Sequence, residues 1–379
     1  MDSVGAGELP DAHLYGDEGS DTLGNIAKQV PLHIPTLRAL GLGRVASIGT
    51  TPADDARGAT GRMAERSAGK DSVTGHWEMM GIVLDRPFPT FPEGFAPEII
   101  AAFSRSTGRR VLGNKAASGT QIIDEYGAEH MRTGALIVYT SADSVFQIAA
   151  HEDVVPVPEL YRACEIAYEM VGEGLGVGRV IARPFVGTPG HFTRTSNRHD
   201  YALKPFSETL LDRATARGVE VVAIGKVQDL FAGRGITRAH HTASDDEGMD
   251  HVLRQLDDTP RGLIFANLVD FDSQYGHRND VAGYAANLER FDARLATLLP
   301  RLAPSDLLIV TADHGNDPTP PSTDHAREYV PLLACGAMGT PGAAVGTRQT
   351  FADLGQTLAE VFHLGALAHG TSFLREITA

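Results

Sequence analysis

The stretch "SDLLIVTADHGND" (305–317) joins a short apolar run to a group of polar residues able to do chemistry. Its continuous apolar part is typical of a strand buried on both faces, and Asp313 and His314 follow where that strand should end. A second stretch, "RGLIFANLVDFDS" (261–273), has the same form and ends on Asp270 and Asp272. Ligands gather beyond the carboxyl ends of strands in open α/β sheets, so both stretches predict one shared site.

Three more stretches read as buried strands: "GALIVYTSADS" (134–144), "GRVIARPFVG" (178–187) and "VEVVAIGKV" (219–227). Apolar residues recur at helical spacing over residues 282–302 and 350–362. Strands that alternate with helices predict an α/β core, with a mostly parallel sheet flanked by helices.

A proline-rich segment, "DRPFPTFPEGFAP" (85–97), interrupts this alternation. The residues after it contain strands of their own, which indicates an inserted domain. We therefore expect core residues 1–87 and 205–379, with an α/β domain of residues 88–204 inserted between them.

Composition narrows the class of protein. The 379 residues are 42% hydrophobic and 21% charged, and 33 basic against 48 acidic residues give a formal charge of −15. Such a charge argues against nucleic-acid binding and fits a protein whose carboxylates hold cations. The two cysteines, Cys164 and Cys335, lie far apart and predict neither a disulfide framework nor a thiolate metal site. The pattern predicts a cytoplasmic protein with no membrane segment and no obligate protein partner.

Acid and histidine residues recur after the two strand ends. Five of them are candidate metal ligands: Asp272, His277, Asp313, His314 and His325. Oxygen and imidazole donors without thiolates suit Mn²⁺ or Mg²⁺, with Zn²⁺ as an alternative. Five ligands exceed what one ion with an open position takes, so the set predicts two ions about 4 Å apart. Taken singly, each Asp also fits a helix N-cap and each His a surface residue.

The stretch "SAGKDSVTGHWEMMG" (67–81) supplies a candidate nucleophile, Ser72. A serine bound by two divalent ions would have a depressed pKa and could attack phosphorus at neutral pH. The alternative is that Asp71 or Ser72 only caps a helix. The two interpretations are compatible, because a helix N-terminus also favours phosphate.

In these motifs and several others, the chain resembles the phosphopentomutases of the alkaline phosphatase superfamily. The similarity runs in order through "MDSVG", "GKDSVTGHWE", "YTSADSV", "ARPFVG", "TRTSNRHDYALKP", "NLVDFDSQYGHR", "TADHGNDPT" and "TDHAREYVPLL" to "GTSFL" (370–374). It implies an alkaline-phosphatase-like core with a cap domain inserted after the nucleophile. It also implies an isomerase of nucleoside catabolism, a phosphomutase that interconverts ribose 1-phosphate and ribose 5-phosphate, and the 2-deoxyribose pair.

The resemblance further implies a phosphoenzyme, a sugar bisphosphate intermediate and two Mn²⁺ per subunit, with Mg²⁺ or another divalent ion as an alternative. Glucose 1,6-bisphosphate or a similar bisphosphate would be the activator. Carried over by motif, one metal is held by Asp2, Asp313 and His314, and the other by Asp272, His277 and His325. Ser72 would bridge the ions and carry the phosphoryl group, although the family pattern has Thr there. The implied substrate contacts are Ser141, Asp143, Arg179, Arg194 and Lys226.

Rival interpretations share the metal site. A metal-dependent phosphatase or phosphodiesterase of the superfamily is the nearest, and the large insertion favours a mutase because only a mutase must exclude water. A sulfatase lacks its C/S-x-P-x-R context in this chain, and a cofactor-independent phosphoglycerate mutase fits the motifs poorly. The remaining alternative is an inactive metal-binding protein.

The first residues raise a separate expectation. In the resembling family the Asp of "MDSVG" directly follows the first core strand, and this strand is missing ahead of Asp2. Because metal ligands need their geometry fixed by surrounding structure, we expect Met1 to be an internal methionine of a chain that starts some ten residues earlier, with an apolar strand. Without it, the sequence predicts a gap in the central sheet and a weakened first metal site.

Overall fold

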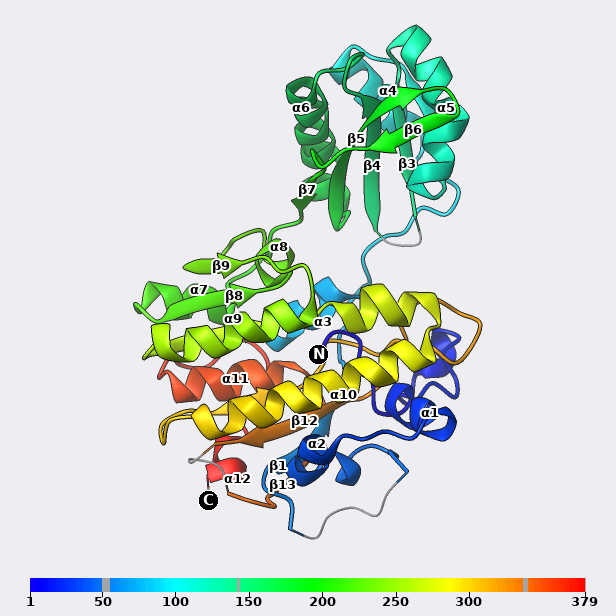
Figure 1. The fold of residues 1–379 in the computed structure, drawn as a ribbon. Coiled ribbons are helices and arrows are strands. Elements are labelled where there is room, and N and C mark those ends of the chain that lie inside the picture. Colours follow the sequence, from blue (N-terminus) through cyan, green and yellow to red (C-terminus); the bar gives the residue numbers. More distant parts are fainter. Residues whose placement is uncertain (50–54, 142–143, 337–339, 379) are drawn as a thin grey trace. The chain divides into compact units, whose positions relative to one another are not determined.

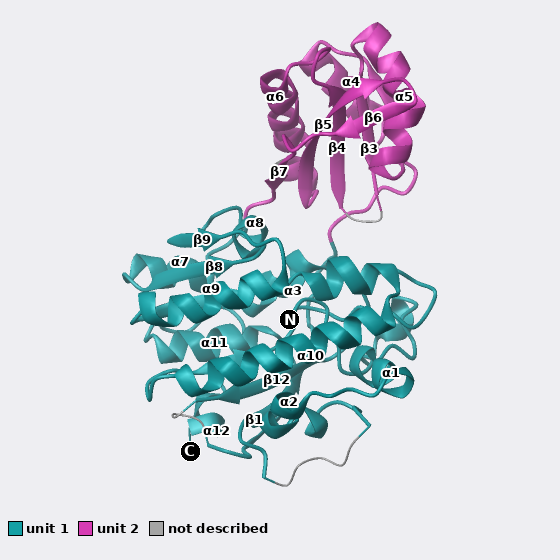
Figure 2. Cartoon of the chain, in the orientation of Figure 1, with its two compact units in different colours: residues 1–87, 205–379 teal, residues 88–204 magenta. Residues whose placement is uncertain are grey.

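The computed structural model describes residues 1–49, 55–141, 144–336 and 340–378. Contacts divide the chain into two units (Figure 2). Unit 1 consists of Met1–Pro87 and Pro205–Ala379, and unit 2 of Phe88–Lys204. Unit 2 is therefore one continuous insertion between the two segments of unit 1.

The strands of unit 1 form two sheets. A four-stranded sheet has the order β11 (Leu308–Val310), β12 (Val330–Cys335), β1 (Ala59–Met63) and β13 (Ala344–Arg348). A three-stranded sheet has the order β10 (Gly262–Ala266), β8 (Glu220–Ile224) and β9 (Arg238–His240). The three-stranded sheet is parallel, as is the β1–β13 pair, whereas β12 runs antiparallel to both of its neighbours. The α/β class predicted from the sequence is confirmed, with mixed rather than uniformly parallel strands.

Helices flank these sheets (Figure 1). They are α1 (Thr22–Gln29), α2 (Pro35–Leu40), α3 (Ser72–Met79), α7 (Leu210–Ala216), α8 (Val227–Leu230), α9 (Asp245–Asp258), α10 (Val281–Leu298), α11 (Ala352–Val361) and α12 (Leu374–Thr378). Helix α9 packs on β8, β10 and α10, while α11 packs on α3 and α7. Side chains fix where several helices begin: Asp280 caps α10, Ser244 caps α9, and Thr209 forms a capping box with Asp212 on α7.

Unit 2 is a three-layer α/β domain. Its sheet has the order β2 (Val111–Ala116), β3 (Leu136–Thr140), β4 (Val145–His151), β5 (Arg179–Thr188) and β6 (His191–Arg194), and β7 (His199–Ala202) also pairs with β5. Helices α4 (Pro97–Thr107) and α6 (Val157–Ala167) cover one face, and α5 (Gly119–Thr133) covers the other.

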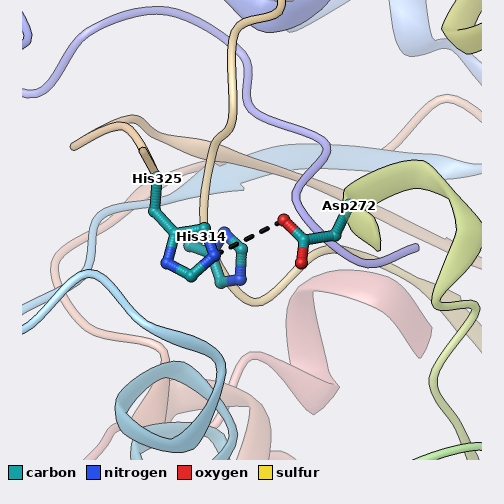
Figure 3. Close-up of side chains that lie close together, drawn as sticks. All are labelled: Asp272, His314 and His325. Carbon is teal, nitrogen blue, oxygen red and sulfur yellow. Dashed lines mark ion pairs between the residues drawn. The ribbon is translucent and has the colours of Figure 1, made fainter. Parts of the chain in front are cut away.

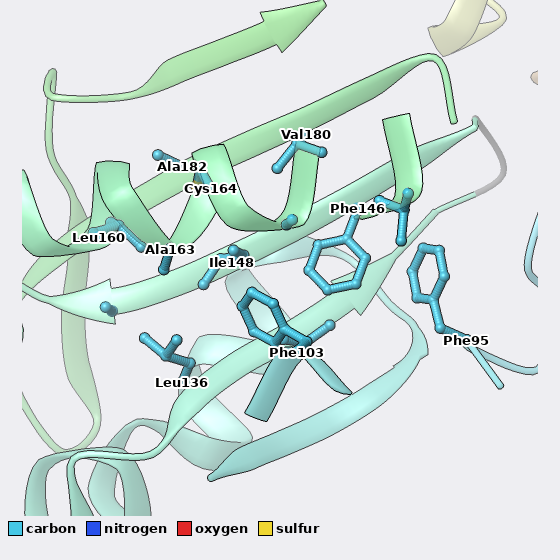
Figure 4. Close-up of a cluster of buried hydrophobic side chains, with 14 of the residues drawn as sticks. Phe95, Phe103, Leu136, Phe146, Ile148, Leu160, Ala163, Cys164, Val180 and Ala182 are labelled. Atoms are coloured by element: carbon cyan, nitrogen blue, oxygen red, sulfur yellow. The ribbon is translucent and has the colours of Figure 1, made fainter. Parts of the chain in front are cut away.

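Alternation along the strands of unit 2 builds a core on each face of the sheet. Figure 4 shows the α4/α6 side, where Phe103 and Cys164 from the helices meet Phe146 and Ile148 of β4. On the α5 side, Ile122 and Ile123 pack with side chains of β3, β4 and β5. Both faces are therefore apolar, as the uninterrupted apolar runs of these strands predict.

The first residues of the chain lie where the two sheets of unit 1 meet. The amino group of Met1 donates to the carbonyl of Thr311 (2.9 Å), and the amide of Asp2 donates to the carbonyl of Leu268 (3.0 Å). These carbonyls follow β11 and β10, so Asp2 lies at the carboxyl ends of both strands. In the described residues β10 and β11 belong to different sheets. No described helix is both long and apolar enough to cross a bilayer.

Candidate metal centre and nucleophile

The nucleophile candidate sits at the start of α3. The carboxylate of Asp71 caps this helix, since its Oδ1 accepts from the amides of Val73 (3.0 Å) and Thr74 (3.1 Å). Asp71 is thus the cap, which leaves the hydroxyl of Ser72 available for other contacts. Ser72 Oγ lies 3.2 Å from His314 Nε2 and accepts a hydrogen bond of 3.2 Å from Lys226 Nζ.

One acid–histidine group lies where Met1–Asp2 meets the end of β11. His314 Nε2 is 3.3 Å from Asp2 Oδ1 and 3.4 Å from Asp313 Oδ2. All three side chains are buried, and their ligand atoms are close enough together to hold one ion. The structure therefore brings together the first set of predicted ligands, which come from opposite ends of the sequence.

A second group surrounds Asp272, which is buried in the turn after β10. Its Oδ1 is 3.4 Å from His325 Nε2, and its Oδ2 is 3.2 Å from His277 Nε2. His314 also reaches this group, because its ring centroid is 4.1 Å from that of His325. Among the described residues, Asp272, His314 and His325 form a second group whose ligand atoms are close enough together to hold one ion (Figure 3). His277, the third predicted ligand of this set, is at the rim, with its side chain 38% exposed.

The charges of this cluster shift the pKa values of its members. Burial raises the pKa of Asp313, but the neighbouring His314 and His76 outweigh burial and hold it well below its usual range. Burial lowers the pKa of His314, but Asp313 and Asp2 outweigh it and raise the pKa to about 10. A histidine that binds a metal ion through its ring is neutral, so a cation that binds here would displace the extra proton of His314.

Several candidate metal-ligand atoms in the cluster have no hydrogen-bond partner among the described residues. Asp2 Oδ1, Asp313 Oδ2 and His325 Nε2 are buried and make ion-pair contacts only. Buried polar atoms without hydrogen bonds are rare in proteins, and here they converge from separate elements. Carboxylate oxygens and imidazole nitrogens without thiolates fit a hard-to-borderline divalent cation, so the residues present suit such an ion.

Lys226 approaches the cluster from the end of β8. Its Nζ is 2.5 Å from Asp2 Oδ2 and 4.0 Å from Asp272 Oδ2. Burial would lower the pKa of Lys226, but Asp2, Asp272 and Asp313 outweigh it and raise the pKa well above its usual value. The ammonium group is therefore a fixed positive charge beside Ser72.

Two supporting residues were not among the predicted site residues. His76 Nδ1 is 2.9 Å from the carbonyl of Ser72 and 3.2 Å from Asp313 Oδ2, so one side chain links the nucleophile to a candidate ligand. Asn316 Nδ2 donates to Asp272 Oδ1 (3.0 Å). Both residues lie within quoted motifs, four and three positions from a predicted site residue, and that proximity was the available signal.

A glycine lets α3 approach this centre. A Cβ atom on Gly75 would lie 2.0 Å from the carbonyl oxygen of Asp313, which no side chain could tolerate. The helix that carries Ser72 therefore packs directly on the backbone of the metal-ligand loop.

The remaining predicted substrate residues lie in unit 2. Ser141 follows β3 and is half-buried, and Asp143 lies outside the described residues. Arg179 begins β5 and pairs with Asp200 at 3.8 Å. Arg194 ends β6 and is exposed. Lys226 is the described substrate candidate that belongs to unit 1, and it contacts both Ser72 and the acid–histidine cluster.

Comparison with known proteins decides the family. A model of the Metalloenzyme superfamily matches residues 1–366. The phosphopentomutase of Caldanaerobacter subterraneus subsp. tengcongensis is 56% identical over 100% of this chain and 96% of its own length. That of Kosmotoga olearia is 55% identical, over 100% of this chain and 98% of its own length. The chain belongs to the phosphopentomutase family.

Membership of the phosphopentomutase family confirms the resemblance drawn from the motifs. Phosphomutases are isomerases, and the superfamily match agrees with a chain whose acids and histidines could hold metal. Among solved structures, a phosphoglycerate mutase from Leishmania mexicana matches with a TM-score of 0.52 at 13% identity, covering 99% of this chain and 96% of that one. This likeness shows the alkaline-phosphatase-like fold alone.

Proposed function

We propose that the chain interconverts ribose 1-phosphate and ribose 5-phosphate, and the 2-deoxyribose pair, through a phosphoserine at Ser72 and a sugar bisphosphate intermediate. Family membership supports the reaction class. The observation that carries the mechanism is the position of Ser72 Oγ, 3.2 Å from both His314 Nε2 and Lys226 Nζ at the edge of the acid–histidine cluster.

In this proposal the cluster holds two divalent cations, of which Mn²⁺ is our choice. Asp2, Asp313 and His314 would hold one, and Asp272, His277 and His325 the other. When bound, the cations would stabilise charge on phosphoryl oxygens and lower the pKa of the Ser72 hydroxyl.

The chain's own residues orient the nucleophile. Asp71 fixes the first turn of α3, and His76 holds the backbone of Ser72 through its carbonyl. The Lys226 ammonium donates to Ser72 Oγ, so it would stabilise negative charge that develops on Oγ or on a transferring phosphoryl group.

One cycle consists of two phosphoryl transfers. A bisphosphate such as glucose 1,6-bisphosphate first primes the enzyme by transferring one phosphoryl group to Ser72 Oγ. A hydroxyl of the pentose phosphate then attacks the phosphorus of the phosphoserine, the P–Oγ bond breaks, and the proton of the attacking hydroxyl passes to Oγ, which leaves a pentose bisphosphate. Ser72 Oγ next attacks the other phosphoryl group of this pentose bisphosphate, the bond between phosphorus and the sugar oxygen breaks, the sugar oxygen takes up the proton of Ser72, and the isomer is released. Water must be kept from the phosphoserine, and we assign that role to unit 2 as a cap.

The test offers ribose 5-phosphate with Mn²⁺ and glucose 1,6-bisphosphate, and follows the products by ³¹P NMR. We expect ribose 1-phosphate to accumulate. Free phosphate without ribose 1-phosphate would instead identify a phosphatase, which is the alternative that shares this metal site.

Substitution of Ser72 tests the nucleophile directly. We expect Ser72→Ala to bind metal but to gain no phosphoryl group by intact mass, whereas Ser72→Thr should still be phosphorylated because a hydroxyl remains. The matched control is Ser207→Ala, since Ser207 is exposed in unit 1 away from these contacts. A phosphorylated Ser72→Ala protein would place the nucleophile elsewhere.

A further inference from the structure

The segment that links β1 to α3 has few backbone hydrogen bonds of its own. Residues 64–71 form neither helix nor strand, although they lead directly to Ser72. The amides of Gly69, Lys70 and Asp71 donate no hydrogen bond within the described chain. A segment with so little internal support can hold Ser72 in one position only if other parts of the fold fix it.

The guanidinium group of Arg327 fixes this segment by its carbonyl oxygens. Its Nη1 donates to the carbonyls of Ser67 and Gly69, both at 2.8 Å. Its Nη2 donates to the carbonyl of Glu65 at 3.0 Å. One side chain therefore binds alternate carbonyls along the segment, and the last of them lies three residues before Ser72.

Carboxylates from two parts of the chain hold the guanidinium group in place. Glu65 Oε2 accepts from Nη1 at 3.0 Å, and Asp11 Oδ2 lies 3.1 Å from Nη2 and 3.3 Å from Nε. The side chains of Arg327 and Glu65 are each 3% exposed. All three guanidinium nitrogens are thus engaged. A lysine has one terminal nitrogen and could not reach these acceptors together.

The loop that contains Arg327 has a second connection to the same segment, through Asp17. Asp17 Oδ2 accepts from the amide of Arg327 (2.9 Å) and from Nζ of Lys70 (3.0 Å). Lys70 Nζ is also 3.1 Å from Asp324 Oδ2. Asp324 and Arg327 lie on either side of His325, a candidate metal ligand. The loop that carries this ligand is therefore bound to the segment that carries the nucleophile.

We propose that Arg327 is a positioning residue for phosphoryl transfer, which ties the segment ending at Ser72 to the loop of His325 and so sets where Ser72 Oγ lies beside the metal centre. In the described chain Arg327 makes no hydrogen bond to Ser72, so it acts through the backbone of residues 65–69. The reaction it serves rests on the proposed function. A misplacement of about 1 Å in a reacting group can cost about 100-fold in rate, so a hold of this kind affects catalysis.

A purely structural role predicts a different outcome. Arg327 pairs with the buried carboxylate of Glu65, so its substitution will lower stability in either case. A residue that only stabilises the fold changes the fraction of enzyme that is folded, whereas a positioning residue changes the kcat of the folded molecules. Measurements on folded protein therefore separate the two roles.

Two substitutions in the full-length protein provide the test. Arg327→Lys keeps the positive charge beside Glu65 but loses the fork that spans three carbonyls, and Arg327→Gln keeps a planar end group with fewer donors. The matched control is Arg348→Lys. Arg348 belongs to unit 1, has a side chain 15% exposed, and donates to the carboxylate of Asp353 (2.6 Å) and the carbonyl of Thr371 (3.1 Å). Circular dichroism shows which variants are folded.

The first measurement is steady-state kinetics with ribose 5-phosphate, Mn²⁺ and glucose 1,6-bisphosphate. We expect both Arg327 variants to lower kcat about 10–100-fold and to change KM by less than about two-fold, because substrate binding is kept and the reacting geometry is lost. Arg348→Lys should keep the kcat of wild type. A folded Arg327 variant with the kcat of wild type would overturn the proposal.

The second measurement needs no turnover and no metal, because it follows hydrogen exchange by mass spectrometry in EDTA. The amides of Arg66, Ser67 and Ala68 are hydrogen-bonded, so they should be protected in wild type. In the Arg327 variants they should exchange at least about ten-fold faster, while the amides of α10 keep their wild-type rates. Unprotected amides at residues 66–68 in wild type, or unchanged exchange in the variants, would overturn the proposal.

Calorimetry with Mn²⁺ alone separates the nucleophile from the metal ligands. We expect the Arg327 variants to lose much less Mn²⁺ affinity than the roughly 10–100-fold that removal of a ligand-orienting group costs, because the backbone bond from residue 327 to Asp17 remains. A loss of Mn²⁺ affinity as large as the loss of kcat would place the effect at the metal ligands and overturn the proposal. If wild type released free phosphate in place of ribose 1-phosphate, the proposed function would fail, and the kcat of that hydrolysis would test Arg327 in the same way.

Discussion

The carboxylate of Glu78 joins the segment before Ser72 to the start of α11, and its removal is the sharpest test of how the site is held. Glu78 is on α3 and fully buried. Its Oε1 accepts from the amide of Arg66 (2.9 Å), the hydroxyl of Thr350 (2.7 Å) and the amide of Phe351 (2.8 Å). Its Oε2 accepts from the amide of Ser67 (2.6 Å).

Substitution of Glu78 should lower the free energy of unfolding by an amount that depends on how many of these hydrogen bonds are lost. Glu78→Ala leaves three buried donors without an acceptor, and each costs about 1–3 kcal/mol, so we expect a loss of about 3 kcal/mol or more; the part-buried amide of Arg66 can turn to water. Glu78→Gln can keep the three bonds at Oε1 but sets its amide against the Ser67 N–H, for a loss of about 2 kcal/mol. Because residues 66–67 lead directly to Ser72, kcat should fall in both variants.

Urea unfolding followed by circular dichroism measures the free energy of unfolding of each variant, and so tests whether Glu78→Ala loses more stability than Glu78→Gln. The control is Glu18→Gln, because Glu18 is an exposed carboxylate of the same unit. A loss below about 1 kcal/mol in Glu78→Ala would refute the reasoning, since it would mean that the donors find other acceptors at little cost. A larger loss in Glu78→Gln than in Glu78→Ala would refute the assignment of bonds to the two oxygens.

Three further predictions concern the buried carboxylate of Glu328, the removal of divalent ions, and Asn316. Burial raises the pKa of Glu328 from 4.5 to about 8, so the folded chain keeps a proton that the unfolded chain releases. The stability that Glu328 contributes is therefore fully present below pH 4.5 and is lost as the pH rises through 8. In urea titrations, wild type should lose roughly 4 kcal/mol of unfolding free energy between pH 5 and pH 8 through this group, and Glu328→Gln should not show that loss. Removal of divalent ions with EDTA should lower Tm by several degrees, and readdition of Mn²⁺ should restore it, because a ligand that binds only the folded state stabilises it by about 2.7 kcal/mol at 100 times its Kd. Asn316→Ala should weaken Mn²⁺ binding about 10–100-fold in calorimetry, because Asn316 orients Asp272; unchanged affinity would make Asn316 purely structural.

Five strands of this fold could be predicted because each is an uninterrupted apolar run in the sequence. The five stretches singled out in the sequence contain β3, β5, β8, β10 and β11, since a buried strand needs an apolar run whatever its partners. Which strands pair could not be predicted in the same way. Strand β12 runs antiparallel between β11 and β1, and its pairing with β1 joins residues hundreds of positions apart in the sequence.

In the candidate site, too, the sequence predicts the residues that follow a strand but not the contacts that depend on packing. Asp313 and His314 were predictable because polar residues at strand ends meet at one edge of a sheet. The contact between His76 and Asp313 was not, because it depends on how closely α3 packs, which the bare Gly75 permits.

Charge links the two functions proposed for this cluster, metal binding and phosphoryl transfer. Asp2, Asp272 and Asp313 bring three buried carboxylates together, and in the chain alone their charge is met by Lys226 and by protons on His314 and His277. Cation binding must therefore expel the imidazole protons, because a ligating nitrogen cannot keep one. Cations held by Asp2 and Asp272 would weaken the attraction of these carboxylates for Lys226, whose other described contact is the hydroxyl of Ser72. Metal loading would thus direct the ammonium charge to the atom that must carry the phosphoryl group.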